Sequence, residues 1–410
     1  MAKRPVLISM GDPAGIGPEL VWRALRERPA LRREVVVVGD MACLRRAAWL
    51  GVVPDSAEGG LVLAELEEPA QWAGLPPGAV GVWQAGDALV PPAWGQVSAA
   101  AGRAAAAAIR QGTQAALDGR ARALVTAPIH KEALAAAGEP YPGHTELLQA
   151  LAARHQGVPV AALPVRMMLS APGLATVLVS IHVSLRDALA AVTTEGVLET
   201  IRITDAHFRR AGLAQPRIAV AGLNPHAGEG GLFGREEIEA IEPAVRAARD
   251  QGIAASGPHP PDTVFMRARQ GAFDVVVAMY HDQGLIPVKL LGLEHGVNTT
   301  LGLPFVRTSP DHGTAFDIAG SGRASADSLW RPSTPRWPRP RRVPALLLEA
   351  VADLAQQDDV LGRRGGRCRG GRRGLALEAV DLLDHQENDE RQDEEVDGHG
   401  DEAAIGQHRH

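Results

Sequence analysis

The chain has 410 residues, of which 45% are hydrophobic and 22% charged, and its formal net charge is -6. This length exceeds one typical hydrophobic core, so more than one domain or lobe is expected. The first 330 residues carry no basic face or stripe, which argues against a nucleic-acid partner. Only Cys43 and Cys368 are present, too few for a disulfide framework, so we expect a reducing, cytoplasmic location.

No stretch approaches the roughly 20 consecutive apolar residues of a membrane span, so no membrane partner is expected. The short apolar segment at residues 6–10 runs into a turn rich in Gly and Pro rather than into a cleavage site. We therefore interpret this segment as a first buried strand and not as a signal peptide.

Short apolar runs alternate with longer amphipathic segments from residue 5 to about residue 329, as is typical of an α/β protein. Strands are predicted over residues 6–10, 34–39, 123–126, 176–181, 217–221 and 275–279. Helices are predicted over residues 17–27, 98–117, 131–137, 185–192, 194–210 and 235–251. The later strands are rich in apolar residues, as expected for central parallel strands buried on both faces. We expect the middle elements to form one lobe and both ends of this region to form the other.

Composition changes abruptly after Leu329, where Pro, Arg and Gly dominate and are followed by an acidic run. Residues 1–329 are therefore predicted to be a two-lobed enzymatic region, and residues 330–410 an aberrant, low-complexity tail that is largely disordered. Within the tail only residues 343–355 have a helical apolar pattern. We interpret the tail as a shifted reading frame of a GC-rich gene; the alternative is an RNA-binding Arg-Gly segment.

Three histidines, His182, His226 and His281, each follow an apolar run with strand character. The carboxyl ends of parallel strands border the ligand crevice of an α/β sheet. Three neutral imidazoles with one open position commonly hold a catalytic divalent metal, so the pattern predicts a metal-assisted enzyme. A single histidine of this kind is as often a hydrogen-bonded core residue. Three acidic residues adjoin the chemical motifs and are candidates for orienting ligands: Asp187, Asp262 and Asp282.

Further motifs are Gly-Asp-Pro-Ala-Gly-Ile-Gly-Pro-Glu at 11–19, Thr-Ala-Pro-Ile-His-Lys at 126–131, Gly-His-Thr-Glu at 143–146 and Asp-His-Gly-Thr-Ala at 311–315. With these motifs in this order, the chain resembles the 4-hydroxythreonine-4-phosphate dehydrogenase (PdxA) family over residues 5 to about 328. The resemblance implies a two-lobed α/β/α fold like that of isocitrate and isopropylmalate dehydrogenases. It also implies a homodimer with the active site at the subunit interface.

The resemblance implies that His182, His226 and His281 bind one divalent metal, the third histidine coming from the partner subunit. Zn, Mg, Mn and Co all suit such a ligand set, so the sequence does not choose among them. The implied substrate-binding residues are His144, Thr145, Lys289, Asn298 and Arg307. A phosphorylated amino acid suits these donors, because Arg provides a bidentate fork and Lys a point charge. Lys289 is also the candidate catalytic residue, and we rank charge stabilisation above a role as general base.

The segment at 311–322 resembles the nucleotide-binding loop of isopropylmalate and isocitrate dehydrogenases. It implies NAD as the cofactor, with NADP not distinguished, bound by four residues: His312, Gly313, Thr314 and Asp317. Gly15-Ile16-Gly17 also follows a predicted strand and opens a helix, but Leu20 stands where a dinucleotide fingerprint has its third glycine. We interpret that turn as close backbone packing or as part of the active cleft.

The implied reaction is NAD-dependent oxidation of phosphorylated 4-hydroxythreonine and decarboxylation to 3-amino-2-oxopropyl phosphate, in pyridoxal phosphate biosynthesis. A Lewis acid suits both steps because negative charge develops on the same oxygen. One alternative is a paralogue that acts on a 4-phosphorylated threonate or erythronate, or on a cyclic diol carboxylate. Another is an inactive product, because the family's final helix is replaced after Leu329 and its loss costs packing energy.

Overall fold

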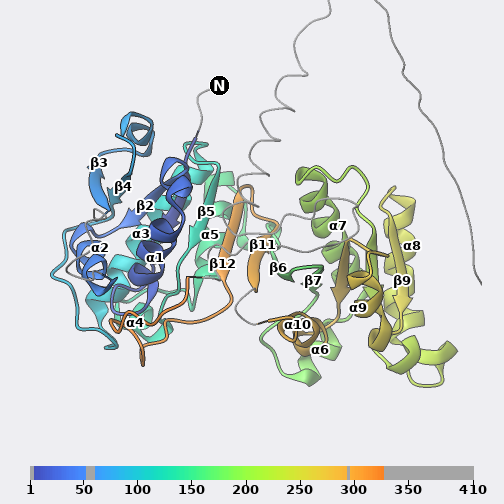
Figure 1. Cartoon of the computed structure of the whole chain (residues 1–410). Coiled ribbons are helices and arrows are strands. Elements are labelled where there is room, and N and C mark those ends of the chain that lie inside the picture. The colour runs from blue at the N-terminus through green and yellow to red at the C-terminus, as the bar shows by residue number, and fades with distance from the viewer. Residues whose placement is uncertain (1–3, 52–60, 293–295, 327–410) are drawn as a thin grey trace, which may run out of the picture. The chain divides into compact units, whose positions relative to one another are not determined.

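The computed structural model describes residues 4–51, 61–292 and 296–326 (Figure 1). All of these residues belong to one unit that spans residues 1–364. The predicted tail, the domain boundary before it and the replaced final helix lie outside the described residues. Within the described part of the chain, no helix combines the length and the apolar character that a bilayer crossing requires.

Twelve strands of the described residues form one sheet in the order β3-β4-β2-β1-β5-β12-β11-β6-β7-β10-β8-β9. Their bounds are Val6–Ser9 (β1), Val35–Gly39 (β2), Val62–Leu66 (β3), Ala79–Gln84 (β4), Ala123–Thr126 (β5), Arg166–Ala171 (β6), Leu174–Leu178 (β7), Ile218–Ala221 (β8), Ala255–His259 (β9), Val275–Ala278 (β10), Val297–Leu301 (β11) and Val306–Pro310 (β12). Every predicted strand is present, with ends that differ by up to three residues.

Two blocks of parallel strands are separated by three antiparallel pairings, of β12 with β11, β11 with β6 and β6 with β7. The link between β6 and β7 is too short for the crossover that a parallel pair needs, and Gly173 turns the chain there with a φ of 84°. The predicted strands are parallel to their neighbours as expected, except that β7 is antiparallel to β6. The sheet as a whole is mixed, because β6 and β11, which were not predicted, run antiparallel to their neighbours.

The helices are Gly17–Glu27 (α1), Met41–Ala48 (α2), Ala99–Leu117 (α3), Lys131–Ala136 (α4), His144–Gln156 (α5), Leu185–Ala191 (α6), Thr194–Arg210 (α7), Glu242–Asp250 (α8), Pro261–Arg269 (α9) and His281–Lys289 (α10). All predicted helices are found. The helix predicted over 235–251 is irregular, because a π-helical turn at Glu237–Ile241 precedes α8.

The side chains of each parallel block alternate between two cores. On β1, Val6 and Ile8 pack in the core that includes α1 and α2, whereas Leu7 packs in the core that includes α3 and α5. On β10, Val277 packs with α7 and α8, and Val276 packs with α9 and α10. Helices therefore cover both faces of each block, which explains why these strands are apolar throughout. The predicted α/β class is confirmed.

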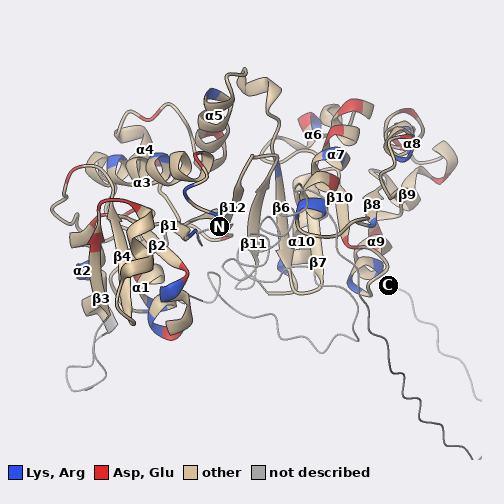
Figure 2. Ribbon diagram, turned by 90° about the horizontal axis from the view of Figure 1, so that it is seen from above, with Lys and Arg blue, Asp and Glu red and all other residues tan. Residues whose placement is uncertain are grey.

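The charged residues are interspersed over the described elements. Figure 2 shows Lys or Arg segments and Asp or Glu segments scattered over both ends of the described structure. Such interspersed charges keep a surface solvated without creating a large field of one sign.

His207 on α7 makes a pH-dependent contribution to stability. Its side chain is buried, and burial lowers its pKa to about 3. An unfolded histidine titrates near pH 6.5, so between about pH 6.5 and 3 the unfolded chain binds a proton that the folded chain does not. The free energy of unfolding is therefore expected to fall as pH decreases through this window, by up to about 1.4 kcal/mol per pH unit from this group.

Denaturant unfolding at several pH values, for the chain and for His207→Gln, measures this contribution. The variant should lose less stability on acidification, because the buried carboxylates contribute equally to both proteins. Identical pH slopes for the two chains would contradict the assignment to His207.

Candidate active site

The three predicted metal histidines follow three neighbouring strands. His182 comes after β7, His281 after β10 and His226 after β8, and in the sheet β10 pairs in parallel with both β7 and β8. The amide of Gln283, in the first turn of α10, donates to the carbonyl oxygen of Gly222 after β8 at 2.7 Å. The prediction that these histidines lie at the ends of parallel strands is confirmed.

His182 and His281 form a pair whose ring centroids are 5.5 Å apart. Two imidazoles bound to one tetrahedral ion have their centroids roughly 5 Å apart, given nitrogen–metal distances of about 2 Å. Nδ1 of His281 lies 2.7 Å from Oδ1 of Asp282, which leaves Nε2 as the nitrogen for an ion. Burial, and then the charges of His281 and Lys131, lower the pKa of His182, so its ring is neutral near pH 7 as a metal ligand must be. The pair fits a divalent cation.

His226 lies in a left-handed turn and is not brought to this pair. Its φ is 53°, and Gly228, Gly230 and Gly231 in the same turn also have positive φ. The side chain of His226 is 65% exposed. Within the described part of one chain, no group of three or more His, Cys, Asp or Glu side chains is placed to hold a metal ion. In the described part of the chain, His182 and His281 are therefore paired without His226.

Glu237 holds the turn that carries His226. Its Oε1 accepts hydrogen bonds from the backbone N–H groups of Leu223 and Asn224, both at 2.7 Å. A Cβ at Gly228 would lie 2.7 Å from Oε2 of Glu237, so the turn packs directly on this carboxylate. The sequence interpretation missed Glu237, because a Glu at the start of an amphipathic helix is usually solvated.

Arg307 on β12 is a buried cation that forms no ion pair in the described part of the chain. Its side chain is 3% exposed. Burial lowers its pKa to about 10, so it remains protonated near pH 7. Nε2 of His144 is buried without a hydrogen-bond partner in the described residues. Burial, and then the charge of Arg307, hold the pKa of His144 well below its usual value, so this ring is neutral. A buried guanidinium beside a neutral imidazole suits a small anion.

The other predicted substrate residues lie on β11, α5 and α10. Asn298 is two residues from Thr300 on β11, so both face the same side of the sheet. Thr145 follows His144 in the first turn of α5, where backbone N–H groups lack partners within the helix. Lys289 ends α10, the helix that begins with His281, and its Nζ lies 2.8 Å from Oδ2 of Asp311.

Glu146 affects the electrostatics of both His182 and Arg307. Burial lowers the pKa of both His182 and Arg307, and the Glu146 carboxylate opposes the decrease in each case. Glu146 is therefore close to both groups, and Lys131 is close to His182. Neither residue was singled out from the sequence, although both lie inside the motifs at 126–131 and 143–146. His182 and Arg307 thus lie in one region of the described structure, around Glu146.

The predicted cofactor loop packs on the turn after β1. The N–H of Ile16 donates to the carbonyl oxygen of Thr314 at 3.0 Å, and the ring of Phe316 stacks on His130 with centroids 4.5 Å apart. Thr314 is buried by this packing. The other predicted cofactor residues are exposed: His312, Gly313 and Asp317.

Gly15 and Gly17 allow the backbone to approach its neighbours. A Cβ at Gly15 would lie 3.0 Å from both Cβ and the carbonyl oxygen of Thr314, and a Cβ at Gly17 would lie 2.3 Å from the carbonyl oxygen of Met10. The interpretation of this turn as close backbone packing is confirmed. Gly15 serves the packing of the 311–322 loop, and Gly17 allows α1 to start close to the backbone of Met10.

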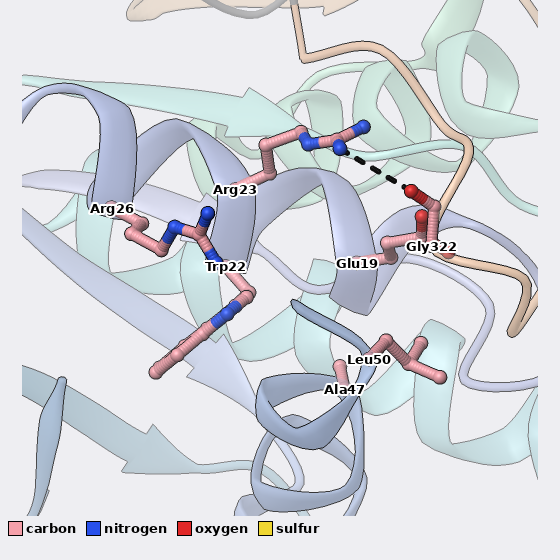
Figure 3. A pocket seen from close by; sticks show the side chains of 7 residues that line it. All are labelled: Glu19, Trp22, Arg23, Arg26, Ala47, Leu50 and Gly322. Atoms are coloured by element: carbon pink, nitrogen blue, oxygen red, sulfur yellow. Dashed lines mark hydrogen bonds between the residues drawn. The ribbon is translucent and has the colours of Figure 1, made fainter. Parts of the chain in front are cut away.

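A separate cavity lies beside α1 (Figure 3). It is lined by Glu19, Trp22, Arg23, Arg26, Ala47, Leu50 and Gly322. Arg23 donates to the carbonyl oxygen of Gly322 at 3.2 Å, so the last described residues pack here on α1. None of the predicted site residues lines this cavity.

The fold and the site together define an α/β enzyme with a site for a small anionic molecule. The sequence profile described as pyridoxal phosphate biosynthetic protein PdxA matches residues 31–332. The chain belongs to this family, which confirms the family prediction.

Characterised relatives extend over most of the chain. It is 53% identical over 330 residues to a 4-hydroxythreonine-4-phosphate dehydrogenase from Beijerinckia indica, covering 80% of this chain and 93% of the relative. It is 46% identical over 332 residues to a D-threonate 4-phosphate dehydrogenase from Salmonella typhimurium, covering 80% and 97%. A crystal structure of 4-hydroxythreonine-4-phosphate dehydrogenase from Klebsiella pneumoniae is 41% identical with a TM-score of 0.72, covering 86% of this chain and 100% of that one. The prediction of a dehydrogenase-type enzyme is confirmed.

Proposed function

We propose that this chain oxidises phosphorylated 4-hydroxythreonine with NAD and decarboxylates the product to 3-amino-2-oxopropyl phosphate, a step of pyridoxal phosphate biosynthesis. The observation that carries this proposal is the combination of a buried guanidinium that forms no ion pair among the described residues and two imidazoles whose ring centroids are 5.5 Å apart. The first suits an anionic group of the substrate, and the second suits a divalent cation. The similarity to the Beijerinckia indica enzyme supports the choice of substrate.

Each predicted residue has a role in this reaction. Arg307 and His144 bind an anionic group, and Thr145 and Asn298 add uncharged hydrogen bonds. Lys289 stabilises negative charge on the oxygen that loses its proton. Its ion pair with Asp311 favours this role over that of a general base, because a carboxylate at 2.8 Å stabilises the positively charged form. A divalent ion, when bound, supplies Lewis-acid stabilisation of the same charge.

We infer that His226 completes the metal site of a partner subunit in a homodimer. His182 and His281 pair within one chain, whereas His226 is exposed in its turn. Large exposed apolar side chains also accompany the three histidine segments: Leu185 is 62% exposed, Leu232 73% and Leu290 80%. Apolar surface of this kind is typical of protein–protein contacts. The active site is therefore proposed to lie at the subunit interface.

We place NAD on the loop at 311–322, where His312, Gly313 and Asp317 are exposed and Thr314 anchors the loop against the turn after β1. A cytoplasmic location is proposed because Cys43 is a free, buried thiol and the chain has no cysteine framework.

Turnover of two substrates tests the assignment. The second candidate substrate is D-threonate 4-phosphate, which the 46% identity to the Salmonella typhimurium enzyme favours. With NAD and added divalent metal, kcat/KM for phosphorylated 4-hydroxythreonine is expected to exceed that for D-threonate 4-phosphate at least about tenfold, as one lost polar contact implies. A reversed ratio would assign the chain to the second substrate. Absence of turnover with either, despite bound metal, would support the inactive alternative.

A further inference from the structure

We propose that Thr126 and Thr300 are positioning residues that aim the guanidinium of Arg307 at the anionic group of the substrate. This inference rests on the proposed function only for the identity of that substrate. The anion site itself is defined by the hydrogen bonds of Arg307 and by the buried, unpartnered Nε2 of His144.

The strand register places both threonines beside Arg307. Strand β12 lies between β5 and β11. Arg307 pairs with Leu124 of β5, and Thr126 lies two residues further on the same face. On the other side, the antiparallel register of β11 places Thr300 opposite Arg307. One threonine from each flanking strand therefore faces the arginine side chain.

Their hydroxyl groups use only part of the hydrogen-bonding capacity of the guanidinium. Nη1 of Arg307 donates to Oγ1 of Thr300 at 2.9 Å, and Nη2 donates to Oγ1 of Thr126 at 2.7 Å. A guanidinium has five N–H donors, so each terminal nitrogen keeps one. Nε of Arg307 is buried without a partner in the described residues. The fork is fixed from both sides while three donors remain for a ligand.

Both groups that accept hydrogen bonds from Arg307, the hydroxyls of Thr126 and Thr300, are uncharged. A buried cation is costly unless an anion compensates it, and here Glu146 is the nearby carboxylate but no carboxylate of the described residues forms an ion pair with Arg307. An Asp or Glu at either position would cancel the charge. A threonine hydroxyl fixes the direction of the fork and leaves its charge for the ligand. The buried, unpartnered Nε2 of His144 provides a second polar atom near Arg307.

Paired substitutions test the role of the hydroxyl groups. Thr126→Val and Thr300→Val keep the branched shape and remove the acceptor, whereas Thr126→Ser and Thr300→Ser keep the acceptor. Each valine variant is expected to raise both the KM for phosphorylated 4-hydroxythreonine and the Kd for inorganic phosphate about tenfold, with kcat changed less than about threefold. Each serine variant is expected to stay within about threefold of the parent in all three constants.

Thr308→Val is the matched control. Thr308 is a buried threonine on β12 next to Arg307 in sequence, so its side chain points to the opposite face of the sheet. Its substitution should leave KM and phosphate affinity unchanged. Steady-state kinetics and calorimetric titration with inorganic phosphate, both on the full chain, provide the measurements.

The outcomes separate this inference from the proposed function. Valine variants that bind phosphate as the parent does and lose only thermal stability would overturn the positioning role, as would serine variants as impaired as the valine variants. If the valine variants lose phosphate affinity but the parent turns over no phosphorylated hydroxythreonine, the positioning role stands and the proposed substrate falls.

Discussion

Replacing His182 with alanine is expected to lower kcat/KM by on the order of 1,000-fold, because Lewis-acid stabilisation of the reacting oxygen is worth several kcal/mol. His281→Ala should have an effect of similar size if both rings bind the same ion, as their centroid distance of 5.5 Å allows. Metal content by atomic spectroscopy should fall together with activity. His155→Ala removes an exposed histidine on α5 and should change neither quantity. Full activity of His182→Ala after treatment with a chelator would refute the metal site.

Mixed dimers test whether His226 is shared between subunits. If each site combines His182 and His281 of one chain with His226 of its partner, a dimer of His226→Ala with His182→Ala keeps one intact site. Co-purified chains should therefore regain activity that neither variant has alone. A dimer of His182→Ala with His281→Ala has two damaged sites and should regain none. Recovery in the second combination would contradict the pairing of His182 with His281 in one chain.

Replacing Lys289 with methionine is expected to lower kcat by about 100- to 1,000-fold, the usual effect of removing one group that stabilises developing negative charge. Lys289→Arg separates the two roles considered for this residue. Arginine keeps the positive charge but cannot accept a proton, so charge stabilisation predicts a much smaller loss, about tenfold. Single-turnover measurements of NADH formation report on the chemical step directly.

Equal losses in Lys289→Arg and Lys289→Met would instead identify the amine as the general base. Arg269→Met is the control, because it removes an exposed positive charge from α9 and should leave kcat unchanged. A Lys289→Met chain with parental kcat would exclude both roles.

Local patterns predicted six of the twelve described strands and six of the ten described helices. The buried strands β1, β2, β8 and β10 are short apolar runs, and α3 is an alanine-rich segment with strong helix propensity. Residues that follow such strands are at the carboxyl ends of the strands, so the positions of the three histidines could also be predicted. The strands β6 and β11 were missed, because their mixed composition gives no clear period.

The contacts within the site depended on long-range pairing. Thr126, Thr300 and Arg307 come from three strands, and only the register of β12 between β5 and β11 makes them neighbours. Lys131 and Glu146 were likewise inconspicuous, because a charged residue in a first helical turn is usually solvated. In the folded chain, both residues affect the pKa of His182, and Glu146 also affects the pKa of Arg307.

By itself, the sequence determined the α/β class, the family and the strand ends at which the chemistry lies, because burial, helix propensity and strand-end motifs are local properties. The tertiary structure decided that the sheet is mixed, that His182 and His281 pair without His226, and that Arg307 is held by two neutral hydroxyl groups. These features follow from pairings between residues far apart in the chain. Such pairings are selected by the packing of the whole sheet, and no short segment specifies them.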